Sequence, residues 1–159
     1  MEIRKAVVMD IPALVPLWID FMDYHAELDP AFTRDPAGAD NWARYIEEKM
    51  KDEVFAVFVA AAEGRLVGYA VAFVQTYPPI WTVKARGFID ELYVDPASRR
   101  GGVGRRLLAA AEAWLTERGM AHVELKVDVA NVPTRRFWKD MGFAPRVEIM
   151  SRELQERTE

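Results

Sequence analysis

The stretch Arg99-Arg100-Gly101-Gly102-Val103-Gly104 lies between a predicted strand over about 87–94 and a predicted helix over about 102–119. Its three glycines let the backbone approach a ligand closely and adopt dihedral angles that other residues avoid. The first amides of a helix have no partner within it, and the helix dipole places positive charge at the same end. The stretch therefore predicts a site for an anionic ligand. The alternative is a tight turn that packs the helix on the strand.

Two familiar nucleotide-binding motifs do not fit this stretch. A P-loop ends in Gly-Lys-Ser/Thr, whereas Gly104 is followed by Arg105 and Arg106. A dinucleotide fingerprint needs a third glycine where Leu107 stands, and it follows the first strand of a parallel unit. These mismatches argue against a P-loop enzyme and against a dinucleotide oxidoreductase.

The composition of the chain excludes further classes of protein and of functional site. The chain has 159 residues, of which 51% are hydrophobic and 29% are charged, as expected of one compact domain. It has no cysteine, which excludes a disulfide scaffold, a thiolate metal site and a cysteine nucleophile. With only two histidines, the sequence predicts no metal site. No apolar run approaches the length of a membrane span, and the N-terminus lacks a secretory signal, so we expect a cytoplasmic protein without a membrane partner.

The charge is unevenly distributed. The net charge of −4 argues against nucleic acid as a partner. Residues 1–53 carry twelve Asp/Glu and six Lys/Arg, whereas residues 99–139 carry nine Lys/Arg and four Asp/Glu. A basic segment in an acidic protein favours a small anionic ligand over a long polyanion. Solvated helix faces would give the same pattern.

Apolar residues recur with the spacing of strands and of helices along the whole chain. The predicted strands cover about 1–8, 54–62, 66–75, 87–94, 121–128 and 144–151, and the predicted helices cover about 11–24, 41–51, 102–119 and 133–141. Glu63-Gly64-Arg65 is predicted to form the turn of a hairpin. This order predicts an α/β domain built on a mixed sheet.

Two motifs together resemble the GNAT superfamily of N-acetyltransferases. The first is Arg99-x-x-Gly102-x-Gly104 after the strand residues 90–94, which resembles that superfamily's acyl-CoA signature. The second is Asn131, then Phe137-Trp138, then Met141-Gly142-Phe143. The order of elements is similar along nearly the whole chain. The resemblance implies an α/β single-domain GNAT-like fold over 1–159, with a mixed, mostly antiparallel sheet of six to seven strands and about four helices.

The resemblance also implies a division of labour within that domain. Residues 1–53 would hold the acceptor-side strand and helices, and 54–128 the central sheet and the CoA-binding helix. Residues 129–159 would hold a C-terminal helix, strand and tail. The expected reaction is transfer of an acetyl group from acetyl-CoA to a primary amine of a small molecule or peptide, by direct attack in a ternary complex. A homodimer is expected, because the fold exposes an edge strand.

Cofactor-binding residues follow from the same resemblance. Backbone amides from Arg100 to Arg105 would hold the CoA pyrophosphate, with Arg99, Arg100 and Arg105 adding positive charge. The backbone of residues 92–94 would pair with the pantetheine arm, and a bulge near Val94 would free an amide for the acetyl carbonyl. The implied set is Leu92, Tyr93, Val94, Arg99, Arg100, Gly101, Gly102, Val103, Gly104, Arg105, Asn131 and Trp138.

Asp90 and Glu91 stand where similar enzymes hold a carboxylate that removes a proton from the amine. Asp90 is preferred, because strand alternation places it on the face of Leu92 and Val94, but a bulge in the strand could reverse this assignment. Many family members use a tyrosine at the position of Trp138 to protonate the CoA thiolate, and an indole cannot replace it as an acid. Tyr69 or Tyr93 could supply that proton, or the thiolate could leave with the assistance of water. The alternative is a non-catalytic acyl-CoA-binding or regulatory module.

Overall fold

The computed structural model describes residues 1–154 and contains two compact units. The first unit runs from Met1 to Lys126, and the second begins at Val127. The whole β-sheet and three of the four α-helices belong to the first unit. The prediction of a single domain over 1–159, with divisions after residues 53 and 128, stays a prediction.

A five-stranded sheet with the order β1-β2-β3-β4-β5 forms the centre of the first unit. Every neighbouring pair is antiparallel except β4 and β5, which are parallel, so the predicted mixed, mostly antiparallel sheet is confirmed. The strands are β1 Glu2–Lys5, β2 Phe55–Ala62, β3 Arg65–Thr76, β4 Ala85–Val94 and β5 Val123–Leu125. The predicted turn between β2 and β3 is also present, with positive φ at Glu63 (52°) and Gly64 (77°).

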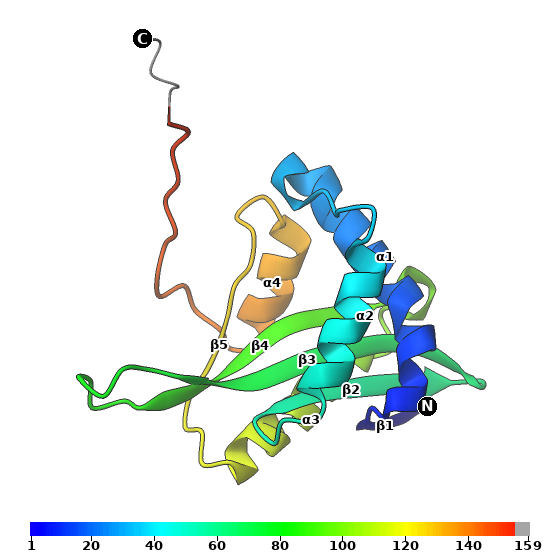
Figure 1. Cartoon of the computed structure of the whole chain (residues 1–159), viewed down its shortest axis with the longest axis horizontal. Coiled ribbons are helices and arrows are strands. Elements are labelled where there is room, and N and C mark those ends of the chain that lie inside the picture. Colours follow the sequence, from blue (N-terminus) through cyan, green and yellow to red (C-terminus); the bar gives the residue numbers. More distant parts are fainter. Residues whose placement is uncertain (155–159) are drawn as a thin grey trace. The chain divides into compact units, whose positions relative to one another are not determined.

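The two faces of the sheet are covered by different helices (Figure 1). The helices are α1 Ile11–Leu28, α2 Gly38–Lys49, α3 Val103–Glu117 and, in the second unit, α4 Val132–Asp140. Leu14 and Trp18 of α1 and Trp42 of α2 share one buried cluster with Val57 and Tyr69 of the sheet. α3 covers the opposite face with the predicted stripe of buried residues, including Leu107, Ala111 and Leu115.

Two glycines of the sheet allow α3 to pack closely. A Cβ at Gly87 would lie 2.7 Å from Cδ1 of Leu115, and a Cβ at Gly68 would lie 3.3 Å from Cδ1 of Leu107 and 2.7 Å from the Tyr93 carbonyl oxygen. A larger residue at either position would push the helix or the strand away. This packing fixes the start of α3 relative to the end of β4, which lie on either side of the glycine-rich loop.

The second unit has a small apolar centre of its own. Trp138 of α4 is 7% exposed and packs edge-to-face on Phe137 and Phe143, with ring centroids 5.0 and 5.2 Å apart. Asn131, which is 1% exposed, accepts a hydrogen bond from the Thr134 amide at 3.3 Å and so caps the start of α4. The predicted helix over 133–141 is confirmed.

The strand predicted over 144–151 is wrong for this structure, so the sheet has five strands rather than six or seven. None of these residues pairs with a strand anywhere in residues 1–154. Val147, Ile149 and Met150 are 79%, 76% and 90% exposed. The backbone N–H and C=O groups of a strand need a neighbouring strand as hydrogen-bond partner, and residues 144–151 have no such neighbour within 1–154. Within 1–154, no helix combines the length and apolar character that crossing a bilayer requires.

Candidate functional site

The glycine-rich loop holds two residues in the left-handed region directly before α3. Arg100 has φ 69° and Gly102, the residue that precedes the first turn of α3, has φ 74°. This conformation costs a non-glycine residue roughly 1–2 kcal/mol, so Arg100 is a point of local strain. Such strain is concentrated at functional sites.

The start of α3 is open to a ligand. No side chain caps the helix there, and a Cβ built on Gly102 meets no atom within 4 Å. Gly101, Gly102, Arg100 and Arg105 are exposed. Uncapped amides, the positive end of the helix dipole and two arginines therefore face unobstructed space, and this fits a pyrophosphate group.

Arg99 ties the loop to the end of β4. Its Nε donates a hydrogen bond to the Val94 carbonyl oxygen at 2.9 Å, and its guanidinium lies 5.8 Å from the Tyr93 ring centroid. Asp95 accepts from the Ala97 amide at 3.0 Å and pairs with Arg65 at 2.8 Å, which fixes the short turn Pro96–Ser98. The loop is thus anchored on the side that precedes the glycines.

The edge of β4 that faces β5 has no strand partner in the second half of β4, within residues 1–154. β5 pairs with β4 only from Gly87 to Ile89, whereas β3 pairs with β4 to its end at Val94. Within residues 1–154, no other strand lies along Leu92, Tyr93 and Val94 on the β5 side. An extended ligand could therefore add to this edge as a strand does.

Glu91 is held by side chains from three other elements. The Tyr69 hydroxyl of β3 donates to its Oε2 at 2.6 Å, and the Trp42 indole nitrogen of α2 donates to its Oε1 at 3.1 Å. The Trp18 indole of α1 stacks on Trp42, with ring centroids 5.3 Å apart. We call these three residues, Trp18, Trp42 and Tyr69, the Glu91 clamp.

The clamp leaves the Glu91 carboxyl with an unusual pKa. Desolvation raises the pKa to about 7, and the negative charge of Asp90 adds to the rise. Hydrogen bonds from Tyr69, Trp42 and Trp18 act in the opposite direction, because they stabilise the carboxylate. Burial and the nearby carboxylate in turn raise the pKa of the Tyr69 hydroxyl well above its usual value. Glu91 therefore exchanges a proton near neutral pH.

A β-bulge changes the alternation that the sequence suggested. Val71 of β3 pairs with Glu91, but the next residue, Ala72, pairs with Ile89, so Asp90 is the extra residue. The bulge predicted near Val94 is therefore wrong, since the register from Glu91 to Val94 is continuous. Asp90 and Leu92 do not follow simple alternation, and this removes the reason for preferring Asp90. Asp90 is exposed, and desolvation raises its pKa while the charge of Lys126 lowers it.

The structure brings most of the predicted site residues together in the first unit. Asp90, Glu91, Leu92, Tyr93 and Val94 end β4, and the loop and α3 follow within a few residues. Asn131 and Trp138 belong to the second unit. Asn131 caps the start of α4, and Trp138 packs against Phe137. Trp42 was not predicted as a site residue, because nothing near it in the sequence resembles a motif.

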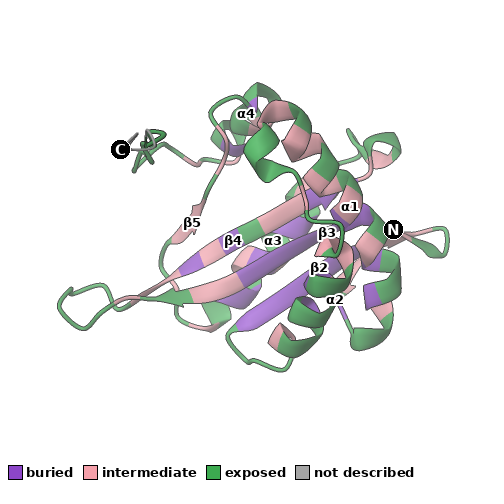
Figure 2. Cartoon of the chain, turned by 45° about the horizontal axis from the view of Figure 1, so that its top comes forward, coloured by how far each residue is buried: buried purple, intermediate pink, exposed green. Residues whose placement is uncertain are grey.

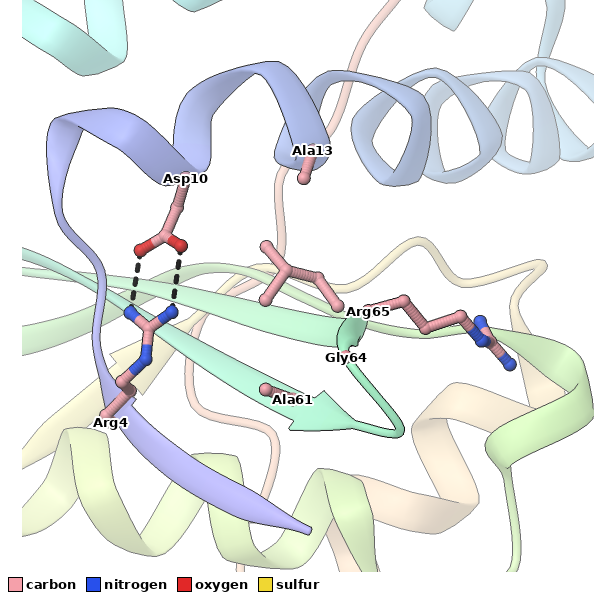
Figure 3. A pocket seen from close by; sticks show the side chains of 7 residues that line it. Arg4, Asp10, Ala13, Ala61, Gly64 and Arg65 are labelled. Atoms are coloured by element: carbon pink, nitrogen blue, oxygen red, sulfur yellow. Dashed lines mark hydrogen bonds and ion pairs between the residues drawn. The ribbon is translucent and has the colours of Figure 1, made fainter.

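A hollow of about 490 Å³ is lined by none of the predicted site residues (Figure 3). It is lined by Arg4, Asp10, Ala13, Ala61, Gly64, Arg65 and Leu66. The Arg4 guanidinium faces both carboxylate oxygens of Asp10, at 2.7 and 2.8 Å (Figure 3). Since Asp10 also accepts from the Val7 amide at 2.8 Å, its carboxylate is already engaged, and the hollow contains no predicted site residue.

Comparisons with known proteins agree with this arrangement. A sequence model of the acetyltransferase (GNAT) family matches residues 18–143. The chain is 33% identical to an uncharacterized N-acetyltransferase of Archaeoglobus fulgidus over 138 residues, covering 87% of this chain and 89% of the relative.

Solved structures with the same fold include one in complex with CoA. A tetramutant of the BH1408 protein from Bacillus halodurans has a TM-score of 0.85 and 25% identity, covering 97% of this chain and 100% of that one. An aminoglycoside N-acetyltransferase solved in complex with CoA has a TM-score of 0.73 and 20% identity, covering 97% and 99%. The family match spans strands β2 to β5, the glycine-rich loop and the Glu91 clamp, and this chain belongs to the acetyltransferase (GNAT) family.

Proposed function

We propose that this protein transfers an acetyl group from acetyl-CoA to a primary amine of a small molecule or peptide. The observation that carries the proposal is the placement of Glu91, with a pKa of about 7, on the strand that leads into the glycine-rich loop. One strand–loop–helix segment thus offers a proton acceptor, a free strand edge and an anion site in sequence order. The solved CoA complex of an aminoglycoside N-acetyltransferase with this fold supports both the donor and a small-molecule acceptor.

The binding part of the proposal rests on the loop. The amides from Arg100 to Arg105 would hold the pyrophosphate, and Arg100 and Arg105 would add positive charge. Arg99 would act mainly by fixing the loop, because its Nε already donates to the Val94 carbonyl oxygen. The β4 edge at Leu92, Tyr93 and Val94 would pair with the pantetheine arm. When bound, acetyl-CoA supplies the activated acetyl thioester.

The chemical part rests on the carboxylate. An alkyl amine is mainly an ammonium ion at neutral pH and must lose a proton before it can attack a thioester. Glu91 in its ionised form would accept that proton, directly or through a water molecule. A pKa near 7 suits a general base at neutral pH better than the usual value of a glutamate. Asp90, next to it in the bulge, would raise the proton affinity of Glu91 by its charge.

The departing thiolate needs a different group. Tyr69 is fully buried and donates to Glu91, so it is poorly placed to protonate a ligand. Tyr93 lies on β4 beside the Arg99 guanidinium and is the better candidate of the two. Trp138 belongs to the second unit, and its indole cannot supply a proton.

A second candidate function is an acyl-CoA-binding module without catalysis, and Trp138 in place of the tyrosine common in the family favours it. The two functions separate in one experiment. Acetyl-CoA is mixed with the protein and a panel of small amines, aminoglycosides and peptides, and free CoA thiol is measured with a colorimetric reagent. Turnover with at least one amine supports the enzyme. Acetyl-CoA binding by calorimetry with no turnover on any amine supports the binding module.

A further inference from the structure

Three phenylalanines lie side by side on the sheet face that carries the Glu91 clamp. Phe55 of β2 pairs with Phe73 of β3, and Phe73 pairs with Phe88 of β4, so the three occupy one level of three neighbouring strands. The ring centroids of Phe55 and Phe73 are 6.4 Å apart and those of Phe73 and Phe88 are 5.1 Å apart, and both pairs are stacked. We call these three residues the aromatic ladder.

The bulge at Asp90 places the ladder and Glu91 on the same face. Phe88 and Glu91 are three residues apart, and in a regular strand they would point to opposite faces. Their partners on β3 are Phe73 and Val71, which are two residues apart and therefore share a face. Since two residues of a strand span about 7 Å, the ladder reaches β4 at about that distance from Glu91.

The β4 end of the ladder is partly open. Phe55 is 3% exposed and belongs to the cluster that α1 and α2 bury, whereas Phe73 and Phe88 are only partly buried. Figure 2 shows the same contrast between the strands: β2 is buried along most of its length, whereas β4 has intermediate and exposed positions. Tyr45 of α2 meets Phe55 edge-to-face at 6.2 Å and is itself 46% exposed. Tyr45, Phe73 and Phe88 therefore offer aromatic surface to a ligand.

Two carboxylates lie beside this aromatic surface. Burial raises the pKa of the Tyr45 hydroxyl, and the negative charges of Asp90 and Glu91 add to the rise, so both carboxylates are neighbours of Tyr45. Asp90 is exposed, and Glu91 is the proposed proton acceptor. An ammonium group would be attracted to this pair of charges. The surface therefore combines a position for a cation with a position for a flat apolar group.

Two lysines limit where a second positive charge could lie. The Lys49 Nζ is 5.9 Å from the centroid of the Tyr45 ring. Burial raises the pKa of Asp90 and the positive charge of Lys126 opposes the rise, so Lys126 is also near the carboxylates. A polyamine or an aminoglycoside would bring further ammonium groups close to these lysines, and like charges repel. The surroundings therefore favour an acceptor with a single positive charge.

We propose that the acceptor is a monoamine with an aryl group on a short alkyl chain, and that Tyr45, Phe73 and Phe88 bind the aryl group. The proposal rests on the acetyl-transfer function and names the class of acceptor. The aryl ring stacks on the open end of the ladder, and the alkyl chain carries the nitrogen to Glu91. The reaction is the one already described: the proton passes to Glu91, the nitrogen bonds to the acetyl carbon, and the C–S bond of the thioester breaks to release the CoA thiolate.

Selectivity between two amines tests the proposal. Phenethylamine carries an aryl group and propylamine does not, so kcat/KM of the parent chain should be about ten-fold or more higher for phenethylamine. Tyr45→Ala and Phe88→Leu should each lower this ratio by about five-fold or more, whereas Tyr45→Phe, which keeps the ring, should lower it much less.

Arg44→Ala is the matched control for these variants. Arg44 is the exposed neighbour of Tyr45 on α2, and its guanidinium donates to the Asn41 side chain at 2.7 Å, so its loss should leave the ratio unchanged. A ratio near one in the parent chain, or the same loss in Arg44→Ala as in Tyr45→Ala, would overturn the proposal.

Direct binding separates this proposal from the reaction on which it rests. Binding of phenethylamine without acetyl-CoA is followed by NMR through the ring protons of the amine. If no amine turns over but phenethylamine binds more weakly to Tyr45→Ala than to the parent chain, acetyl transfer fails and the aryl-amine surface is supported. If other amines turn over while phenethylamine neither binds nor reacts, acetyl transfer is supported and the aryl-amine acceptor is overturned.

Spermidine tests the part of the two lysines. Lys49→Gln removes a positive charge beside Tyr45 and should raise kcat/KM for spermidine relative to phenethylamine a few-fold at low salt, where charges are least screened. Lys51→Gln is the matched control, because the Lys51 Nζ pairs with Glu48 at 2.6 Å. A preference of the parent chain for spermidine over phenethylamine would contradict an acceptor with a single positive charge.

Discussion

The glycine-rich loop and the Glu91 carboxylate belong to one strand–loop–helix segment, yet they are built in opposite ways. The loop over 99–105 is largely exposed, and its shape comes from backbone dihedral angles at Arg100 and Gly102. Glu91 is enclosed by side chains from three elements, and its protonation comes from burial and hydrogen bonds. Changes in the loop should therefore alter ligand binding with little effect on protonation, whereas changes around Glu91 should alter protonation with little effect on CoA binding.

The largest effect is expected from Glu91→Gln. The amide keeps the size of the side chain but cannot accept the amine's proton, so kcat/KM should fall by about 100-fold or more. The measurement is steady-state kinetics with an amine that gives turnover, and acetyl-CoA affinity should stay within about two-fold of the parent chain.

Asp90→Asn is the control for that change. It removes a carboxylate at the adjacent position, outside the clamp, and should lower kcat/KM by less than about ten-fold, since Asp90 acts only through its charge. If Asp90→Asn lowered kcat/KM as much as Glu91→Gln does, the assignment of the general base to Glu91 would be contradicted.

Gly102→Val tests the loop. A side chain there enters the space assigned to the pyrophosphate and strains a residue with φ 74°, so the Kd for CoA should rise by about ten-fold or more. Gly64→Val is a matched control, because Gly64 has φ 77° and equally open space in the β2–β3 turn. Calorimetric titration should show weaker CoA binding for the first variant only, while thermal unfolding shows similar losses for both. Equal CoA affinities would remove the loop from the binding site.

Tyr69→Phe and Trp42→Phe separate the hydrogen bonds of the clamp. Each removes one donor to the Glu91 carboxylate, so each should raise the pKa of Glu91 above about 7. Tyr69 is the stronger influence, and its loss should also lower the free energy of unfolding by about 1–2 kcal/mol. Denaturant unfolding and the pH dependence of kcat/KM check both points. A larger pKa change in the Trp42 variant would contradict the ranking.

The smallest effect is expected from the loop arginines. Arg100→Ala/Arg105→Ala should weaken CoA binding a few-fold at low salt and less at high salt, because exposed charges are screened. Arg99→Ala should lower stability more than binding, since Arg99 anchors the loop to Val94. Titrations of CoA and dephospho-CoA across a salt series check this. An affinity loss that does not change with salt would mean that these arginines do not contact phosphate.

The sequence predicts the loop better than it predicts the carboxylate. Gly102 has a positive φ, one of the dihedral angles that the glycines of the loop are expected to permit, and this freedom is a local property of the residue. The face on which Asp90 and Glu91 lie depends on a bulge, and the bulge depends on pairing between β3 and β4, which no local pattern reveals. Trp42 reaches Glu91 from 49 positions away in the chain, through the packing of α2 on the sheet.

The C-terminal segment illustrates a different limit. The alternation of apolar and polar residues in this segment favours a strand. A strand forms, however, only where a neighbouring strand is available for pairing. The alternation indicates only a preference of 144–151 for extended backbone, and no strand within residues 1–154 pairs with this segment.

A titration that needs no acceptor substrate tests whether the clamp holds Glu91 with a pKa near neutrality. Carbon-13 NMR of protein labelled at the glutamate side-chain carboxyl follows every glutamate with pH, and the signal lost in Glu91→Gln identifies Glu91. We expect a midpoint of about 7 for that signal, well above the usual range for glutamate. A midpoint near the ordinary value of about 4.3 would show that burial does not set its protonation, and would contradict Glu91 as the neutral-pH base.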